Sequence, residues 1–422
     1  MESQTHRTRT LWLIGTLHAF THVYQVALIP LYLKVQAGFH LASKADATLL
    51  ITLMNVAYFL PAYPMGILAD RCNRRTLLGL GLLLNAVGFT GLAFAPNYAA
   101  AVACVLVAGI GGSVFHPAST GLVAGLFPEN SGRALGLVGI GASVGFFFGP
   151  IYAGWRADQS GDWRTPVLEL GLLGIGMAAL FFRLAESDDH RTAAPVSRRT
   201  KPGTLFPTAG LWVLFLGAAF AFCARDFAGS SMTTLGSLFL LQAQGFSARQ
   251  TGLALGCLFI ASAISNPIFG HLSDRGRSRW AAFVLLLAAT LVALFPHVPP
   301  GAIIPVLMTY GFFFMASYPI VEAALMESVP AAVRGRVFGL WITIGGLLGN
   351  LAHWLNGRWV EALGASASAV ESYFTIYAGL AGLIVISLLG LPCLKAIRRR
   401  QQLADAAPAA ASPLAAPHAS LE

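Results

Sequence analysis

The chain has 422 residues, of which 56% are hydrophobic and only 11% are charged, and its formal net charge is +9. Soluble domains carry about 25% charged residues, so this composition excludes a soluble globular protein and indicates that lipid covers most of the surface. The five cysteines have no paired spacing, which argues against a disulfide framework or a zinc site.

Twelve apolar segments are each long enough to cross a hydrocarbon layer of about 30 Å. The first is too long for a cleavable signal peptide and leads directly into a second span. In chain order, the predicted spans are residues 11–33, 48–69, 76–95, 98–126, 134–155, 165–184, 208–241, 251–272, 280–296, 302–322, 337–355 and 373–394. We therefore predict a six-helix bundle at 1–184, a cytoplasmic linker at 185–205, a second six-helix bundle at 206–400 and a disordered tail at 401–422.

Lys and Arg residues are distributed unevenly between the two sides of the predicted spans. With both termini inside, 20 of the 27 lie on the inner side, 6 lie on the outer side, and Arg225 lies within a span. This is the positive-inside pattern, which predicts that both termini are cytoplasmic. The basic charge therefore reflects topology, and no nucleic-acid partner is predicted.

The first span carries several polar side chains. His18, His22 and Gln25 follow an i, i+4, i+7 spacing on one helical face, and Tyr24 lies beside them. Ionisable groups are costly in hydrocarbon and mark functional sites by default, so we predict that these four residues bind substrate or protons. The two histidines would hold a metal ion only with a ligand from another helix, so we assign no metal site.

A short basic loop follows the second span and recurs after the eighth. In each copy an Asp beside an Arg at the end of a span can pair across an interface that opens and closes, and a Gly allows close approach. The candidate gating residues are Gly66, Asp70, Arg71 and Arg75 in the first copy and Gly270, Asp274 and Arg275 in the second.

His116, which precedes Pro117 in the fourth span, is predicted to line the same cavity as the first-span histidines. The fifth span carries small residues at regular spacing, which let helices pack backbone to backbone, and a proline that bends it. These residues are Gly136, Gly145, Gly149, Pro150 and Gly154.

The seventh span carries Arg225 and Asp226, and Ser230 continues a polar stripe on the face of Asp226. Adjacent helix residues point about 100° apart, so we expect that the two charges do not simply neutralise each other. Arg225 would bind an anionic group of the substrate, and Asp226 would carry a proton. Alternatively, either residue locks the interface between the halves.

The tenth span carries Glu322, one turn after Tyr318, as a candidate for the same site or, alternatively, for the cytoplasmic end. His353 in the eleventh span is expected at the membrane interface beside Trp354.

The two halves of the chain are related by duplication. Asp70 and Asp274 are 274 − 70 = 204 positions apart, and His22 matches Asp226 at the same offset. Six spans per half make the two copies parallel. The fold class predicted is an all-α membrane protein with 12 transmembrane helices in two parallel six-helix repeats around a central cavity.

The doubled Gly-x-x-x-Asp-Arg loop resembles the signature of the major facilitator superfamily over nearly the whole chain. The resemblance implies that the loop residues form a gating latch and that the chain is a monomeric transporter. The glycine spacing of the fifth span is similar to the antiporter motif of that family, with Ala153 at one glycine position, and implies export. Val105 replaces the Arg that proton-coupled drug exporters usually carry in the fourth span.

Among subfamilies, His18-x-x-x-His22 and the His116-Pro117 step resemble the fosmidomycin-resistance type of bacterial exporter. The resemblance implies a secondary active transporter in the bacterial inner membrane, a proton-coupled antiporter of a small polar or anionic organic compound. Alternatives are a proton-coupled importer of a nutrient anion and an exporter of a metal or metal chelate. The sequence shows no nucleotide loop or nucleophile–base arrangement, so neither an enzyme nor a cofactor is predicted.

Overall fold

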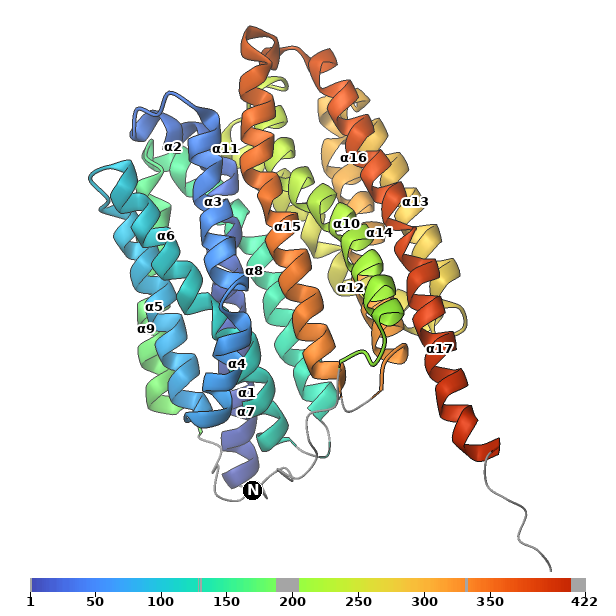
Figure 1. Cartoon of the computed structure of the whole chain (residues 1–422). Coiled ribbons are helices and arrows are strands. Elements are labelled where there is room, and N and C mark those ends of the chain that lie inside the picture. Colours follow the sequence, from blue (N-terminus) through green and yellow to red (C-terminus); the bar gives the residue numbers. More distant parts are fainter. Residues whose placement is uncertain (1, 128, 130, 187–204, 331–332, 411–422) are drawn as a thin grey trace, which may run out of the picture.

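The structure is a computed structural model that describes residues 2–127, 129, 131–186, 205–330 and 333–410. These residues form helices and turns, with no β-strand among them. The helices make two bundles that stand side by side, the first coloured blue to green and the second green to red in Figure 1. The predicted all-α class is therefore confirmed.

The bundles meet along two helix pairs, α3 with α15 and α8 with α11. The first bundle contains α1 (Glu2–Val26), α2 (Tyr32–Gly38), α3 (Lys44–Phe59), α4 (Ala62–Arg71), α5 (Arg74–Ala93), α6 (Tyr98–Ser113), α7 (Phe115–Leu126), α8 (Ser131–Ser160) and α9 (Arg164–Leu184). The second contains α10 (Ala209–Gln242), α11 (Ala248–Ile260), α12 (Ser262–Ser273), α13 (Arg277–Leu294), α14 (Ile303–Glu327), α15 (Arg334–Ala362), α16 (Phe374–Ser387) and α17 (Gly390–Ala410).

Eleven helical stretches of the described residues are long and apolar enough to cross a membrane. Of the twelve predicted spans, the one not among them is the first in the chain, which corresponds to α1. Its polar residues, including His18, His22 and Gln25, lower its apolar content. Near the end of the chain, α17 continues to Ala410, beyond residue 400 where the second bundle was expected to end. Residues 187–204 of the predicted linker and 411–422 of the predicted tail lie outside the described part.

Prolines account for two breaks within spans. Pro117 has no N–H to donate to the carbonyl of Ser113, and its ring clashes with that carbonyl. The helix therefore ends at Ser113, and the fourth span divides into α6 and α7. Pro61 acts in the same way on the second span, which divides into α3 and α4. The first of these breaks places His116 in the first turn of α7.

Glycines bring the two bundles into backbone contact at the end opposite the chain termini, which we call the far end. A Cβ atom on Gly154 of α8 would lie 2.1 Å from the carbonyl oxygen of Ala248, and one on Gly252 of α11 would lie 2.1 Å from that of Pro150. No side chain fits at such separations. The α8–α11 contact therefore depends on glycine at both positions.

Hydrogen bonds join the bundles at the same end. The Ser43 hydroxyl donates to a Glu361 carboxylate oxygen at 2.5 Å, and the backbone N–H of Arg249 donates to Asp158 at 2.9 Å. At the opposite end, Gly136 and Gly339 would have no heavy atom within 4 Å of an added Cβ. The bundles are thus sealed at the far end, while glycines at the end that carries the termini have space around them.

The far-end contact predicts a strong effect of one methyl group. Gly154→Ala should weaken the α8–α11 contact, because the new Cβ meets the Ala248 carbonyl, and should increase labelling of a cysteine placed at Ser43 by an impermeant thiol reagent. Gly176→Ala is the matched control, since an added Cβ there has no heavy atom within 4 Å. Equal labelling of the two variants would contradict the sealed interface.

Candidate functional site

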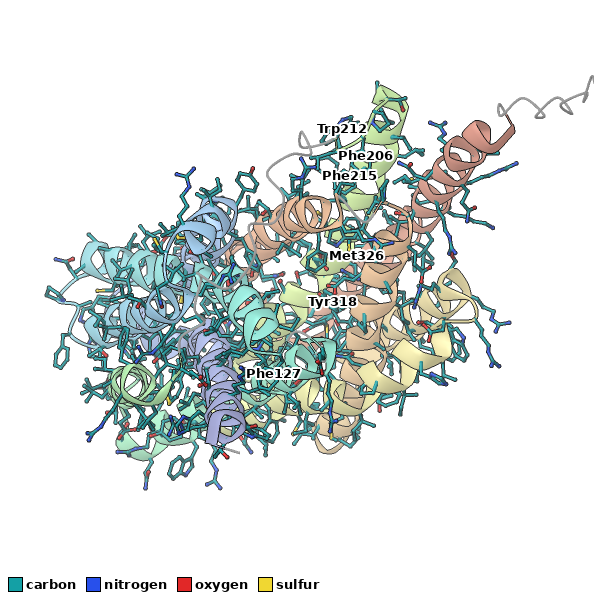
Figure 2. The ribbon with its side chains drawn as sticks, turned by 90° about the horizontal axis from the view of Figure 1, so that it is seen from below. Phe127, Phe206, Trp212, Phe215, Tyr318 and Met326 are labelled. Atoms are coloured by element: carbon teal, nitrogen blue, oxygen red, sulfur yellow. The ribbon has the colours of Figure 1, made fainter. Side chains whose placement is uncertain are left out.

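A cavity of about 450 Å³ lies between the two bundles, near the middle of the molecule. Its wall is formed by α1, α3, α7 and α8 on one side and by α10, α11, α14 and α15 on the other. Seen from the end that carries the termini, Tyr318 lies close to the centre, between the bundles (Figure 2). A smaller pocket of about 180 Å³ shares Ser230, Tyr318 and Glu322 with this cavity and extends it towards Arg225.

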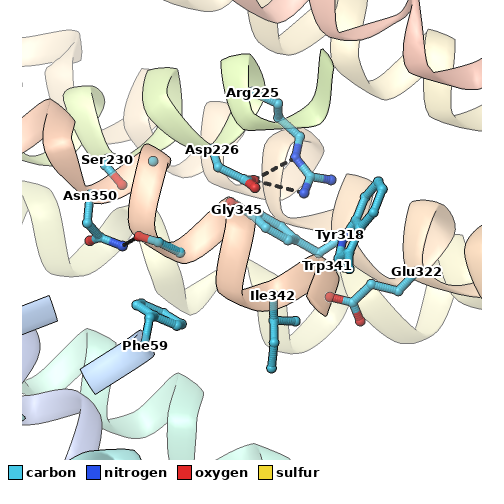
Figure 3. A pocket seen from close by; sticks show the side chains of 12 residues that line it. Phe59, Arg225, Asp226, Ser230, Tyr318, Glu322, Trp341, Ile342, Gly345 and Asn350 are labelled. Atoms are coloured by element: carbon cyan, nitrogen blue, oxygen red, sulfur yellow. Dashed lines mark hydrogen bonds and ion pairs between the residues drawn. The ribbon is translucent and has the colours of Figure 1, made fainter. Parts of the chain in front are cut away.

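Arg225 is the most deeply buried charged residue in this region, with 1% of its surface exposed. Its Nη2 and Nε donate to Asp226 Oδ1 at 2.8 and 3.0 Å, and its guanidinium lies over the Tyr318 ring at 4.0 Å (Figure 3). The expectation that the adjacent charges do not neutralise each other is therefore wrong. The Arg side chain is long and flexible enough to turn back along the helix and reach the carboxylate of its neighbour.

Glycines on α15 make room for this ion pair. A Cβ on Gly345 would lie 2.7 Å from Asp226 Oδ2, and one on Gly349 would lie 2.9 Å from Asp226 Cβ. Glu322 of α14 lines the same pocket. In the part of the chain that the structure describes, Arg225 Nη1 is buried and has no hydrogen-bond partner. A buried guanidinium N–H without an acceptor is costly, which makes Nη1 a candidate donor to a bound anion.

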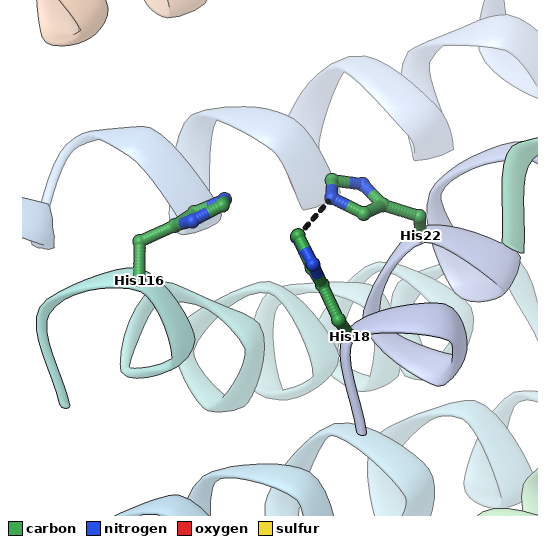
Figure 4. A group of neighbouring side chains, drawn as sticks. All are labelled: His18, His22 and His116. Carbon is green, nitrogen blue, oxygen red and sulfur yellow. Dashed lines mark hydrogen bonds between the residues drawn. The ribbon is translucent and has the colours of Figure 1, made fainter. Parts of the chain in front are cut away.

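Three histidines form a cluster on the opposite wall of the cavity (Figure 4). His18 and His22 come from successive turns of α1, and His116 comes from the start of α7. The Nε2 atoms of His18 and His22 are 3.0 Å apart, and ligand atoms of all three residues lie within 4.8 Å of one another. His116 thus lies where the sequence left a further ligand to another helix, and the three rings could together hold a metal ion.

The remaining sequence candidates divide into those at the cavity and those away from it. Gln25 and Ser230 line the cavity. Tyr24 does not: its hydroxyl donates to the carbonyl of Leu170 in α9 at 3.1 Å, and its ring packs within the first bundle. Tyr24 is therefore placed as a packing residue of that bundle.

The structure adds His353 to the cavity wall. Its side chain is 4% exposed, its Nδ1 lies 2.5 Å from the Thr234 hydroxyl, and its Nε2 lies 3.1 Å from Asn350 Oδ1. The expected position at the membrane interface is wrong. The sequence signal for this position was the spacing of three residues between Asn350 and His353, which puts the two polar side chains on one helical face.

The second copy of the loop signature forms an ionic cluster within the second bundle. Arg277 donates to Asp274 at 3.0 Å and to Glu327 at 2.6 Å, and Arg398 donates to Glu327 at 2.9 Å. Arg275, the candidate gating residue beside Asp274, is exposed. Asp274 follows the end of α12 and Arg277 begins α13, so the short turn between the two helices brings these side chains together.

In the first copy, Gly66 lies in α4, where an added Cβ would be 4.0 Å from Pro117 Cβ. Arg75 donates to the carbonyl of Phe182 in α9, and Arg71 is exposed. The side chain of Asp70 lies outside the described part of the structure.

The glycines of the fifth span serve two contacts. Added Cβ atoms on Gly145 and Gly149 would meet α1, at Ala19 and at Val23 and Val26, whereas Gly154 faces α11 across the far end. Pro150 lies within α8, between the two contacts. Gly136 faces open space, so these residues do not act as a single packing surface.

The Major Facilitator Superfamily model matches residues 11–353. This chain belongs to that superfamily. It is 27% identical over 323 residues to the multi-drug resistance efflux pump PmrA of Streptococcus pneumoniae, covering 73% of this chain and 78% of that one. It is 23% identical over 231 residues to the quinolone resistance protein NorA of Staphylococcus aureus, covering 54% and 57%.

Solved structures of the superfamily share the fold. A bacterial homologue of the human lysosomal transporter Spinster, in an inward-facing and unoccupied conformation, aligns with a TM-score of 0.74 at 17% identity, over 93% of this chain and 97% of the other. The nucleoside transporter NupG aligns with a TM-score of 0.71 at 16% identity, over 92% and 99%. Membership of the superfamily makes the chain a multi-pass membrane transporter that acts on a small molecule, and not an enzyme. The fosmidomycin-resistance resemblance stays a prediction.

The buried ion pair predicts how stability responds to its removal. Asp226→Leu leaves the Arg225 guanidinium unpaired and should destabilise the protein by about 3–5 kcal/mol. The double variant Arg225→Met with Asp226→Leu should recover most of that loss, because no unpaired charge remains. Thermal unfolding of the detergent-purified proteins ranks the stabilities of the wild type and the two variants. Equal unfolding midpoints for the single and double variants would contradict the pairing.

Proposed function

We propose that this transporter is a proton-coupled exporter, an antiporter of a small polar or anionic organic compound. The membrane is the bacterial cytoplasmic membrane, both termini are cytoplasmic, and the chain acts as a monomer. The observation that carries the proposal is the buried Arg225–Asp226 pair in the pocket that joins the central cavity. The efflux pumps among the relatives and the glycine spacing of the fifth span support the direction.

The pocket offers a donor and acceptors within one space. Arg225 Nη1 has no acceptor among the described residues and can donate to an anionic oxygen of the substrate. Glu322 and Asp226 line the same pocket and can accept from a hydroxyl or ammonium group of the substrate. Protonation of either carboxylate removes its negative charge and converts one of its oxygens to a donor, which weakens its binding of such a group. Proton and substrate then compete for one site, which is the condition for antiport.

Alternating access follows from the contacts between the bundles. With both termini cytoplasmic, the sealed far end faces outwards and the structure represents an inward-facing state. Opening outwards requires the α8–α11 contact and the Ser43–Glu361 hydrogen bond to separate. The two loop signatures, with Gly66, Asp70, Arg71 and Arg75 in one and Gly270, Asp274 and Arg275 in the other, would latch the cytoplasmic end when it closes.

The role of the Asp226 carboxylate in export can be tested without knowing the substrate. An efflux-deficient bacterium expressing the wild type should become resistant to at least one member of a panel of phosphonates, organic anions and lipophilic cations. Asp226→Asn keeps the shape of the side chain but cannot take part in proton exchange. Resistance should therefore fall to the level of the empty vector.

Glu371→Gln is the matched control, because it makes the same change at an exposed acid outside the cavity. It should retain wild-type resistance, and immunoblots of membranes should show equal amounts of each protein. Full resistance in the Asp226→Asn strain would remove this carboxylate from the coupling mechanism. Greater sensitivity of the wild type than of the empty vector would indicate import instead of export.

A further inference from the structure

The two first-span histidines face each other through nitrogen atoms whose protonation is set by their other partners. His18 Nδ1 lies 2.9 Å from the carbonyl oxygen of Val138, which can only accept, so Nδ1 carries the hydrogen and Nε2 keeps a lone pair. His22 Nδ1 lies 2.6 Å from Gln25 Oε1, and with this orientation of the amide its hydrogen is on Nδ1 as well. With the hydrogens assigned in this way, the lone pairs of the two Nε2 atoms face each other at 3.0 Å.

Such a contact is repulsive unless a cation lies between the nitrogens. A single proton can bridge two imidazoles, but it cannot bind a third imidazole at the same time. The structure supplies a third imidazole, because a ring nitrogen of His116 lies within 4.8 Å of a ring nitrogen of both His18 and His22. We propose that His18, His22 and His116 bind a divalent transition-metal ion of the Zn²⁺ class in the wall of the central cavity.

The geometry fits a metal ion once the His116 ring moves inward, because the three ligand atoms lie within 4.8 Å of one another and those of a tetrahedral zinc site are about 3.3 Å apart. Zinc–nitrogen bonds are about 2.0–2.1 Å long, so nitrogens 3.0 Å apart subtend about 94° at the ion. Opening this separation by about 0.3 Å gives the tetrahedral angle. Imidazole ligands select Zn²⁺, Ni²⁺ or Cu²⁺ over Mg²⁺ and Ca²⁺, which prefer oxygen.

The surroundings of the cluster match those of known metal sites. Ligating histidines usually donate their second N–H to a carbonyl or carboxylate oxygen, which fixes the ring and its tautomer. Val138 and Gln25 fill this role for His18 and His22. His116 is exposed to the cavity, which gives an ion access and leaves its remaining coordination positions facing the cavity.

This site goes beyond the proposed antiport and does not depend on the direction of transport. It can be tested by calorimetric titration of the full chain with Zn²⁺ alone, using protein purified in detergent through an affinity tag without histidine. We expect one Zn²⁺ per chain, no saturable binding of Mg²⁺, and a higher unfolding temperature with Zn²⁺. His116→Gln removes one ligand and should lower the affinity at least about tenfold, and Gln25→Leu should lower it about 10- to 100-fold.

His297→Gln is the matched control, because the His297 ring packs on Phe374 at 4.0 Å, away from the cavity. The Zn²⁺ affinity of this variant should equal that of the wild type. The double variant His18→Gln with His22→Gln should lose both Zn²⁺ binding and the Zn²⁺-dependent rise in unfolding temperature. The unfolding transition without metal shows whether each variant is folded. Absence of saturable Zn²⁺ binding by the wild type, or an affinity unchanged in the folded His116→Gln protein, would overturn the proposal.

Discussion

Hydrocarbon offers no hydrogen bonds to the chain, and this constraint determines where the polar side chains of the spans lie. Arg225 is almost completely enclosed, yet it has the carboxylate of Asp226 and the face of Tyr318 as partners. The histidines of α1 point into the same central cavity from the other bundle. Because lipid cannot satisfy these groups, they collect at the interface between the bundles, where a substrate, a proton or an ion can reach them.

The offsets of the sequence repeat pair positions of the two bundles, but the two cavity walls differ in chemistry. Position 22 carries a histidine in the first bundle, and its counterpart at the offset of 204 is Asp226 in the second. His116 and Tyr318 occupy corresponding positions at an offset of 202. One wall therefore presents the imidazoles of α1 and α7, and the other presents a guanidinium and carboxylates. A cargo held between them meets two different kinds of group.

The sequence was sufficient for the fold class and for eleven of the twelve predicted spans, because span length and hydropathy are local properties. It was insufficient for contacts that depend on side-chain conformation. The angle between adjacent residues suggested that Arg225 and Asp226 diverge, whereas a flexible Arg side chain turns back to its neighbour. Tyr24 and His353 were misplaced because hydropathy does not reveal which face of a helix meets another helix. The role of Gly154 against α11 required the packing of two distant segments.

The most direct test of alternating access is to hold the far end closed. Ser43 and Glu361 are joined across the two bundles by a hydrogen bond of 2.5 Å, so cysteines at these positions, in a chain without its five native cysteines, can be linked by a short thiol cross-linker. The account predicts that cross-linked cells lose resistance to an exported compound and regain it when a reductant cleaves the link. Export that continues at the wild-type rate with the link complete would contradict the account.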